Sequence, residues 1–90
     1  MVRVSIPPTL RWLCGGEDSV EVRPGTVREA IQQLQARFHG VADRLCDSQG
    51  RVRGSVLVLV NDEDIRFLQE QATPLKPGDE VSLVPSFAGG

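Results

Sequence analysis

The sequence predicts an α+β domain in which a mixed β-sheet carries one main helix on one face. Three observations predict this class. Residues 2–6 and 19–23 alternate apolar and polar side chains, as half-buried strands do, and residues 27–38 carry apolar side chains at helical spacing. Residues 56–60 are apolar at every position, which is typical of a strand covered on both faces. A chain of 90 residues makes one domain with a modest core.

The first two strands are predicted to pair as a hairpin with a long connection. Pro7-Pro8 ends the first of them. The connection, residues 9–19, is expected to be a loop held to the domain by a hydrophobic anchor. That anchor contains Leu10, Trp12 and Leu13.

The helix begins at a capping box, in which Thr26 accepts a hydrogen bond from a backbone N–H and Glu29 reaches back. Its apolar stripe faces the sheet, and Gly40 offers a C-terminal stop. The members of the stripe are Val27, Ala30, Ile31, Leu34 and Phe38. Residues 41–46 are expected to add a short helical turn.

The second half of the chain supplies the remaining strands. Residues 61–64 form a turn, residues 65–67 a short strand and residues 80–85 the last strand. A single helix covers only one face of the strand at 56–60. Its other face is predicted to be either a docking surface or covered by a local loop. Alternation does not distinguish the two faces of an all-apolar strand, and Leu57 and Leu59 are assigned to the outer one.

Composition and charge exclude several classes of protein. A net charge of −2 excludes a concentrated basic surface for nucleic acid, and no apolar run is long enough to cross a bilayer. The N-terminus lacks the apolar core of a signal peptide. Cys14 and Cys46 match no metal or redox spacing, so we expect reduced thiols in a cytoplasmic protein, and a monomer when free.

Little in the chain points to chemistry of its own. His39 is the only histidine, which excludes a multi-histidine metal site, and no glycine-rich phosphate loop is present. A calcium loop beginning at Asp62 would need glycine where Phe67 stands. Pairing of Cys14 or Cys46 with His39 as a nucleophile is disfavoured. The sequence therefore predicts that the chain is not an enzyme and binds no cofactor or metal.

The C-terminal residues are the most informative stretch. We divide the chain into a folded domain, residues 1–85, and a tail, residues 86–90, which would span about 17 Å if extended. Gly89 and Gly90 lack Cβ atoms, so they can thread a narrow channel, and the reactive group at the tip is the carboxylate of Gly90. A frayed, inert end is the other interpretation.

The order of strands, the turn at 77–81 and the ending Val84-Pro85-Ser86-Phe87-Ala88-Gly89-Gly90 resemble the ThiS/MoaD family of ubiquitin-like β-grasp sulfur carriers. The similarity runs over essentially the whole chain. Residues 60–67, read together with the Gly-Asp turn and Ala-Gly-Gly, are most similar to carriers that serve cysteine biosynthesis and secondary-metabolite sulfuration.

The resemblance implies a mechanism. A ubiquitin-activating-type adenylyltransferase would use ATP to adenylate Gly90, and a sulfur donor would convert the adenylate to a thiocarboxylate. A cysteine synthase-like or thiazole synthase-like enzyme would then accept the sulfur. Ala88 and Gly89 would thread the tail into these active sites. The chain would be a cosubstrate, with all cofactors held by its partners.

Partner recognition is assigned to apolar and charged residues of the tail and of the domain. Phe87 can anchor in a partner pocket, and Leu57 with Leu59 can supply an apolar patch. Arg66 and the carboxylates at 62–64 can steer association. Three alternatives stay open, namely the small subunit of molybdopterin synthase, a protein modifier that joins Gly90 to lysine, and a binding module with an inert tail.

Overall fold

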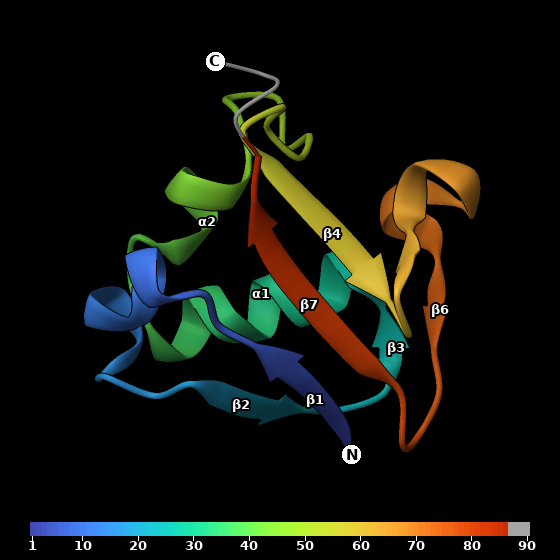
Figure 1. Ribbon diagram of the computed structural model, residues 1–90, viewed down its shortest axis with the longest axis horizontal. Coiled ribbons are helices and arrows are strands. Elements are labelled where there is room, and N and C mark those ends of the chain that lie inside the picture. The colour runs from blue at the N-terminus through green and yellow to red at the C-terminus, as the bar shows by residue number, and fades with distance from the viewer. Residues whose placement is uncertain (87–90) are drawn as a thin grey trace.

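The computed structural model describes residues 1–86 and places one main helix against one face of a five-stranded sheet (Figure 1). The strands of the sheet lie in the order β2-β1-β7-β4-β5. Their bounds are β1 Val2–Ser5, β2 Ser19–Val22, β4 Val56–Val60, β5 Glu63–Asp64 and β7 Glu80–Pro85. The predicted mixed sheet with one main helix is confirmed, because β1 runs parallel to β7 while the other pairs are antiparallel.

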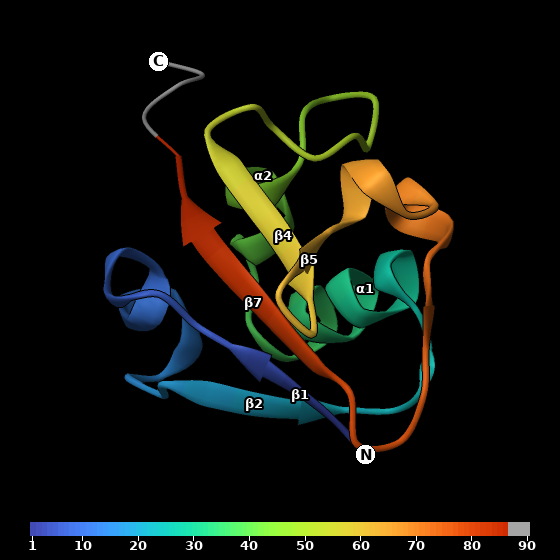
Figure 2. The same ribbon diagram turned by 45° about the vertical axis from the view of Figure 1, so that its right-hand side comes forward.

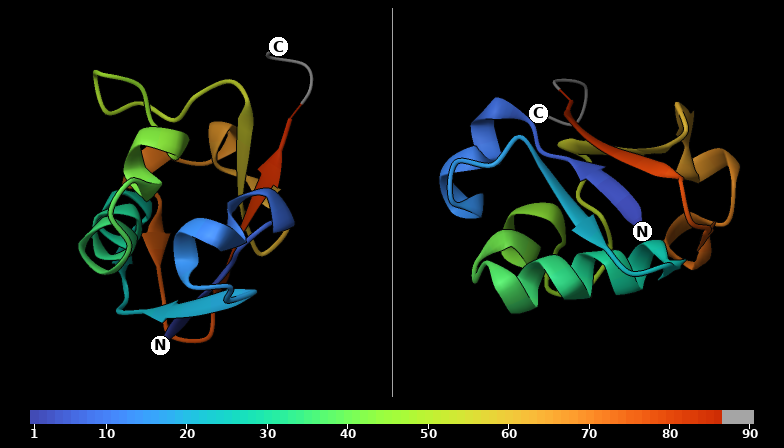
Figure 3. Two further views of the ribbon diagram at one scale, coloured as in Figure 1. Left: turned by 90° about the vertical axis from the view of Figure 1, so that its left-hand side faces the viewer. Right: turned by 90° about the horizontal axis from the view of Figure 1, so that it is seen from below.

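Helix α1 (Val27–Arg37) crosses the inner face of the sheet, as Figures 2 and 3 show from the side and from below. The predicted apolar stripe is buried, apart from Phe38, which is half-buried just beyond the helix. It meets the inward-facing apolar side chains of the four long strands. Those side chains are Val2, Val4, Val20, Val22, Val58, Val60, Val81 and Leu83.

The predicted start of the main helix and the short helical turn after it are confirmed. The capping box is complete, because the Thr26 hydroxyl accepts from Glu29 N–H at 3.2 Å and the Glu29 carboxylate accepts from Thr26 N–H at 3.0 Å. The short turn that follows is α2 (Val41–Leu45), and both of its end residues are buried. Gly40 does not end α1 but precedes α2 as its N-cap. None of the helices within residues 1–86 has the length and apolar character needed to span a bilayer.

The strand predicted at residues 65–67 is wrong. The structure forms a two-residue strand, β5, and then the 3₁₀ helix η2 (Ile65–Phe67). The Asp64 carboxylate accepts a hydrogen bond from the backbone N–H of Arg66 at 2.8 Å, which turns the chain into the helix. The alternating pattern of Ile65, Arg66 and Phe67 therefore reflects a helical turn with one buried residue, Ile65.

The loop predicted for residues 9–19 is also wrong in part. Most of it is the 3₁₀ helix η1 (Pro8–Cys14). Its anchor is Cys14, which is fully buried, together with the half-buried Leu10 and Leu13. Trp12, expected to belong to the anchor, is 65% exposed.

A second, two-stranded sheet was not predicted. It joins β3 (Gly25–Thr26) to β6 (Pro74–Leu75) next to the start of α1. The 3₁₀ helix η3 (Glu70–Ala72) precedes β6. Strands of two residues carry too little periodicity to be recognised from the sequence.

A hydrogen-bonded clamp holds the turn between β4 and β5 against the turn before β7. Asn61 and Asp62 both have positive φ, as the two-residue hairpin turn requires. The Asn61 amide donates to Asp79 Oδ1 at 3.0 Å, and the backbone N–H of Lys76 donates to Asp79 Oδ2 at 2.8 Å. These two hydrogen bonds hold the pKa of Asp79 below its usual value.

We expect the clamp to make stability depend on pH. Because the pKa of Asp79 is lower in the folded chain, its contribution is fully present above the unfolded pKa of about 4 and is lost as pH falls through the folded value. The Asp79→Asn variant should therefore have a lower free energy of unfolding than the unmodified chain at pH 7. Its free energy of unfolding should also fall less between pH 7 and pH 3. Urea denaturation at both pH values measures this. Asp62→Asn, in the same hairpin turn but outside these hydrogen bonds, is the control. An acid dependence unchanged by Asp79→Asn would contradict the assignment.

Candidate functional site

The last described residues leave the domain at one end of the central strand, β7. Pro85 is paired with Val56, and the backbone N–H of Ser86 donates to the Ser55 carbonyl at 2.8 Å. Backbone pairing therefore continues one residue beyond the boundary predicted at residue 85. Ser86 is fixed next to β4, and we call this point the tail exit.

The residues predicted to carry the chemistry follow the tail exit. Phe87, Ala88, Gly89 and Gly90 lie outside the described residues. Their assigned roles, as a partner anchor, in threading and as the site of adenylation, stay predictions. What the structure provides is the surface from which they extend.

That surface includes an apolar patch on the outer face of the sheet. Val58 and Val60 point into the core, with 2% and 7% of their surface exposed, so Leu57 and Leu59 point to the opposite face, as predicted. Val84 lies directly across from Leu57 and completes the patch. All three side chains are half-buried. We call Leu57, Leu59 and Val84 the outer patch.

Sequence reasoning missed Val84, although a signal for it was present. Val81 and Leu83 alternate with Ser82 and Val84 in the last strand, and the first pair is buried. In the paired strands β4 and β7, Val84 lies directly opposite Leu57. Because residues that lie opposite each other point to the same face of a sheet, Val84 points outward as Leu57 does. The register, and not the pattern of either strand alone, identifies the patch.

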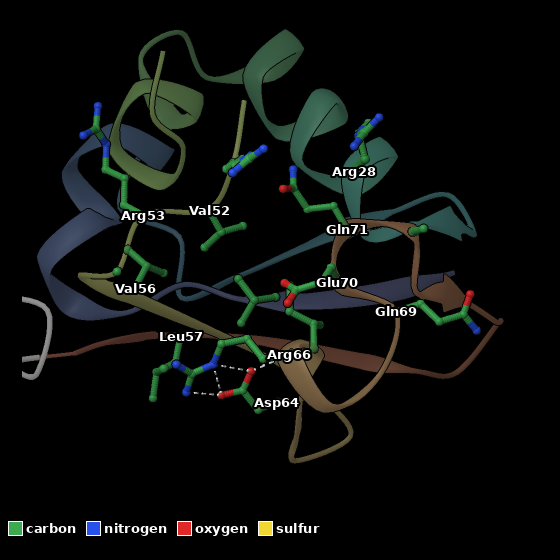
Figure 4. A pocket seen from close by; sticks show the side chains of 15 residues that line it. Arg28, Val52, Arg53, Val56, Leu57, Asp64, Arg66, Gln69, Glu70 and Gln71 are labelled. Carbon is green, nitrogen blue, oxygen red and sulfur yellow. Dashed lines mark hydrogen bonds and ion pairs between the residues drawn. The ribbon is translucent and has the colours of Figure 1, made fainter. Parts of the chain in front are cut away.

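Arg66 lies beside the patch but does not present a free charge. Its guanidinium makes two short contacts with the Asp64 carboxylate, Nη2 to Oδ2 at 2.7 Å and Nε to Oδ2 at 3.0 Å (Figure 4). Asp64 is the cross-strand partner of Leu59, which places the ion pair at the border of the outer patch. Hydrogen bonds from Arg66 hold the pKa of Asp64 below its usual value, so the pair stays ionised at neutral pH.

A groove of about 610 Å³ runs from this ion pair toward the start of α1. Apolar side chains of β4 and η2 line it, including Leu57, and Figure 4 shows Arg28 and Arg53 at its far side. The Gln71 side chain donates to the Gly50 carbonyl at 2.8 Å and ties η3 to the loop before β4. The groove thus brings two of the predicted partner residues, Leu57 and Arg66, to one rim.

The groups that could support chemistry within residues 1–86 are not arranged for it. Cys14 and Cys46 are free, buried thiols, and burial raises the pKa of each, which disfavours the nucleophilic thiolate. His39 is exposed. No group of three or more His, Cys, Asp or Glu side chains in the described part could hold a metal ion.

The sequence of this chain is similar to the sequences of known proteins. Residues 4–90 match the ThiS family. Sulfur carrier protein CysO of Mycobacterium tuberculosis is 42% identical over 91 residues, which cover 99% of this chain and 98% of CysO. Small archaeal modifier protein 3 of Haloferax volcanii is 40% identical over 65 residues, 72% of this chain and 70% of that protein.

Solved structures give the same result. CysO in the BexX/CysO complex of Amycolatopsis orientalis superimposes with a TM-score of 0.92 at 40% identity, and each chain is covered completely. The crystal structure of M. tuberculosis CysO gives a TM-score of 0.91 at 40% identity, covering 96% of this chain and 99% of CysO. The predicted β-grasp fold is confirmed. Since the family match spans nearly the whole sequence, this chain belongs to the ThiS family.

Proposed function

We propose that this chain is a sulfur carrier protein that works through the carboxylate of Gly90. The observation that carries the proposal is the full-length similarity to CysO, a sulfur carrier protein. The fold that this chain shares with the crystal structure of CysO supports it.

The first step activates an unreactive group. A carboxylate oxygen of Gly90 attacks the α-phosphate of ATP, a P–O bond breaks, and pyrophosphate leaves. The acyl adenylate that results is a good electrophile because AMP is a good leaving group. An activating enzyme of the adenylyltransferase class supplies the ATP site and the catalytic groups, so this chain is its protein cosubstrate.

The second step introduces sulfur. A hydrosulfide-equivalent nucleophile attacks the carbonyl carbon of Gly90, a C–S bond forms, and AMP departs with the former carboxylate oxygen. The thiocarboxylate is anionic at neutral pH and carries its charge on a nucleophilic sulfur. An acceptor enzyme of the cysteine synthase-like or thiazole synthase-like class then takes the sulfur from the tail. The carboxylate is regenerated when water replaces the sulfur.

The domain is the part that these enzymes recognise. We assign the outer patch to the enzyme-facing surface, with the Arg66–Asp64 ion pair at its border. A relative at 40% identity is known in complex with a second protein, BexX, which supports a partner-binding role for this fold. We place the reaction in the cytoplasm, where ATP is available and where Cys14 and Cys46 would stay reduced.

A second candidate function is protein modification. The similarity to small archaeal modifier protein 3 favours it. In that reaction a lysine amine, and not sulfur, would attack the adenylated Gly90, giving an isopeptide bond. Both functions share the adenylation step and differ in the nucleophile.

Exchange of labelled pyrophosphate into ATP tests the shared step. We expect the activating enzyme of the same organism to catalyse exchange only when this chain is present, and Gly90 amidated at its carboxyl group to give none. The amidated chain is the matched control, because it differs in one terminal group alone. Exchange that is equally fast without this chain would contradict the proposal. It would favour the alternative in which the chain is a binding module with an inert tail.

A further inference from the structure

An exposed tryptophan and an arginine lie together near the tail exit. Trp12, on η1, is 65% exposed, and its indole N–H donates to the Thr9 carbonyl at 3.0 Å. The guanidinium carbon of Arg44, on α2, lies 5.4 Å from the centre of the indole ring, within the range of a cation–π contact. We call this pair of side chains the Trp12–Arg44 platform.

The domain core does not need the indole. Helix η1 is held by Cys14, which is fully buried, and by Leu10 and Leu13, which pack against the core. Trp12 instead presents a large apolar ring to solvent in an orientation fixed by two contacts. Rigid, exposed tryptophan and arginine side chains are the residue types most enriched at binding hot spots.

A hollow connects the platform to the tail exit. It has a volume of about 210 Å³, and its lining includes Thr9 of η1, Arg44 of α2, and Ser55 and Pro85 beside the exit. Ser55 is the residue whose carbonyl holds Ser86 at the exit. Figures 1 and 3 show η1 and α2 on the side of the molecule toward which β7 runs. The platform is therefore continuous with the surface around the tail exit.

Arg44 also keeps its charge available. The one salt bridge among residues 1–86 is Arg66–Asp64, so no carboxylate in the described part forms a salt bridge with Arg44. An aromatic ring with an uncompensated guanidinium above it suits a partner segment that combines an apolar side chain with a carboxylate.

We propose that the Trp12–Arg44 platform and the adjoining hollow are a docking site for the activating enzyme. The inference rests on the proposed function, because an enzyme that takes Gly90 into its active site must surround the tail exit. We assign the platform to the activating enzyme because every cycle of a sulfur carrier begins with it. An apolar side chain of the enzyme packs on Trp12 and in the hollow, and an acidic side chain pairs with Arg44. The outer patch is a second contact, and two contacts on different sides of the exit fix the direction in which the tail enters.

The chain itself supplies the probe, because Trp12 is its only tryptophan. Full-length chain labelled with 5-fluorotryptophan gives one fluorine resonance, which reports on this side chain alone. We expect the resonance to shift or broaden when the activating enzyme is added. We also expect Trp12→Ala and Arg44→Ala each to raise the KM for the carrier in the pyrophosphate exchange reaction by about tenfold, with little change in kcat, the effect of losing one hot-spot contact.

Two controls separate docking from folding. Arg23→Ala removes an exposed arginine after β2, at the end of the sheet opposite to the tail exit, and should leave KM unchanged. Trp12→Phe retains an aromatic ring and should raise KM less than Trp12→Ala. If Trp12→Ala does not fold, the fluorine resonance and Trp12→Phe still decide the question.

Three results would overturn the inference. The resonance could stay unchanged at saturating enzyme while the wild-type chain is adenylated, in which case the proposed function stands and the platform does not contact this enzyme. The resonance could respond only to the sulfur-accepting enzyme. The platform would then be a docking site for that enzyme and not for the activating enzyme. If no activating enzyme adenylates the wild-type chain, the proposed function fails and the inference fails with it.

Discussion

Removal of Gly90 is expected to abolish thiocarboxylate formation and to leave the melting temperature of the domain unchanged. The deletion moves the terminal carboxylate back along the chain by about 3.3–3.6 Å. A misplacement of 1 Å at a reacting centre can cost about 100-fold in rate, so a whole residue should remove the activity. Stability should not change, because every buried apolar residue of the described part lies between Val2 and Leu83. Intact mass and thermal unfolding measure the two effects.

Gly89→Ala is the matched variant for this deletion. It keeps the length of the tail and adds a single methyl group, so it tests the narrow channel separately from the reach of the chain. We expect a partial loss of activity. Thiocarboxylation of the shortened chain at the wild-type rate would contradict the role of Gly90. Unfolding of the shortened chain would show that the tail is part of the fold.

Leu57→Ser is expected to raise the KM for the carrier in the adenylation reaction by about 3- to 10-fold. Fully burying an exposed leucine side chain contributes about 1.5–3 kcal/mol, and each 1.4 kcal/mol corresponds to a factor of ten. Since Leu57 is already half-buried in the free domain, about half of that free energy is left to gain on association. Because Leu57 is half-buried in the free domain and lies outside the core, its loss should affect association more than folding. Steady-state pyrophosphate exchange at varied carrier concentration gives the value.

The control is Arg3→Ser, on the same face of the sheet but on β1, with β7 between it and Leu57. Like Leu57→Ser, this variant introduces a serine, here in place of an exposed side chain. It should leave KM within twofold of the wild-type value, as surface changes away from an interface usually do. Equal effects of the two substitutions would mean that the outer patch is not the enzyme-facing surface.

The helix was predictable because it rests on local information. Thr26 and Glu29 specify where α1 begins, and the spacing of its apolar residues specifies the face that packs on the sheet. Leu57 and Leu59 were assigned to the outer face although the all-apolar pattern of β4 does not distinguish its two faces, and the patch was completed only by Val84 through the register of β4 with β7. Register is a tertiary property and has no signature within one strand.

The failures have physical causes of the same kind. Residues 65–67 alternate as a strand does, but the Asp64 side chain bonds to the backbone N–H of Arg66 and a helical turn forms instead. Trp12 was expected to belong to the hydrophobic anchor of the loop at residues 9–19. In η1 the short 3₁₀ turn directs Cys14 into the core, and Trp12 is left to contact Arg44. Both outcomes depend on a contact that the sequence pattern does not reveal. One is the hydrogen bond between Asp64 and the backbone N–H of Arg66, and the other is the contact between Trp12 and Arg44.

The reactive end at Gly90 stays a prediction from the sequence, which needs only two glycines and a carboxylate at the right distance from the last strand. The proposed recognition surface could not be predicted in the same way, because a docking site is defined by residues from several elements. The outer patch, the Arg66–Asp64 pair and the Trp12–Arg44 platform each combine side chains from two elements.

Intact-protein mass spectrometry tests the central claim most directly. The full chain is incubated with its activating enzyme, ATP and sulfide, and fragmentation of the product then locates the modification. We predict a mass gain equal to the difference between sulfur and oxygen, confined to the fragment that contains Gly90. A gain on Cys14 or Cys46, a lysine adduct at Gly90, or an unchanged mass in the presence of active enzyme would contradict it.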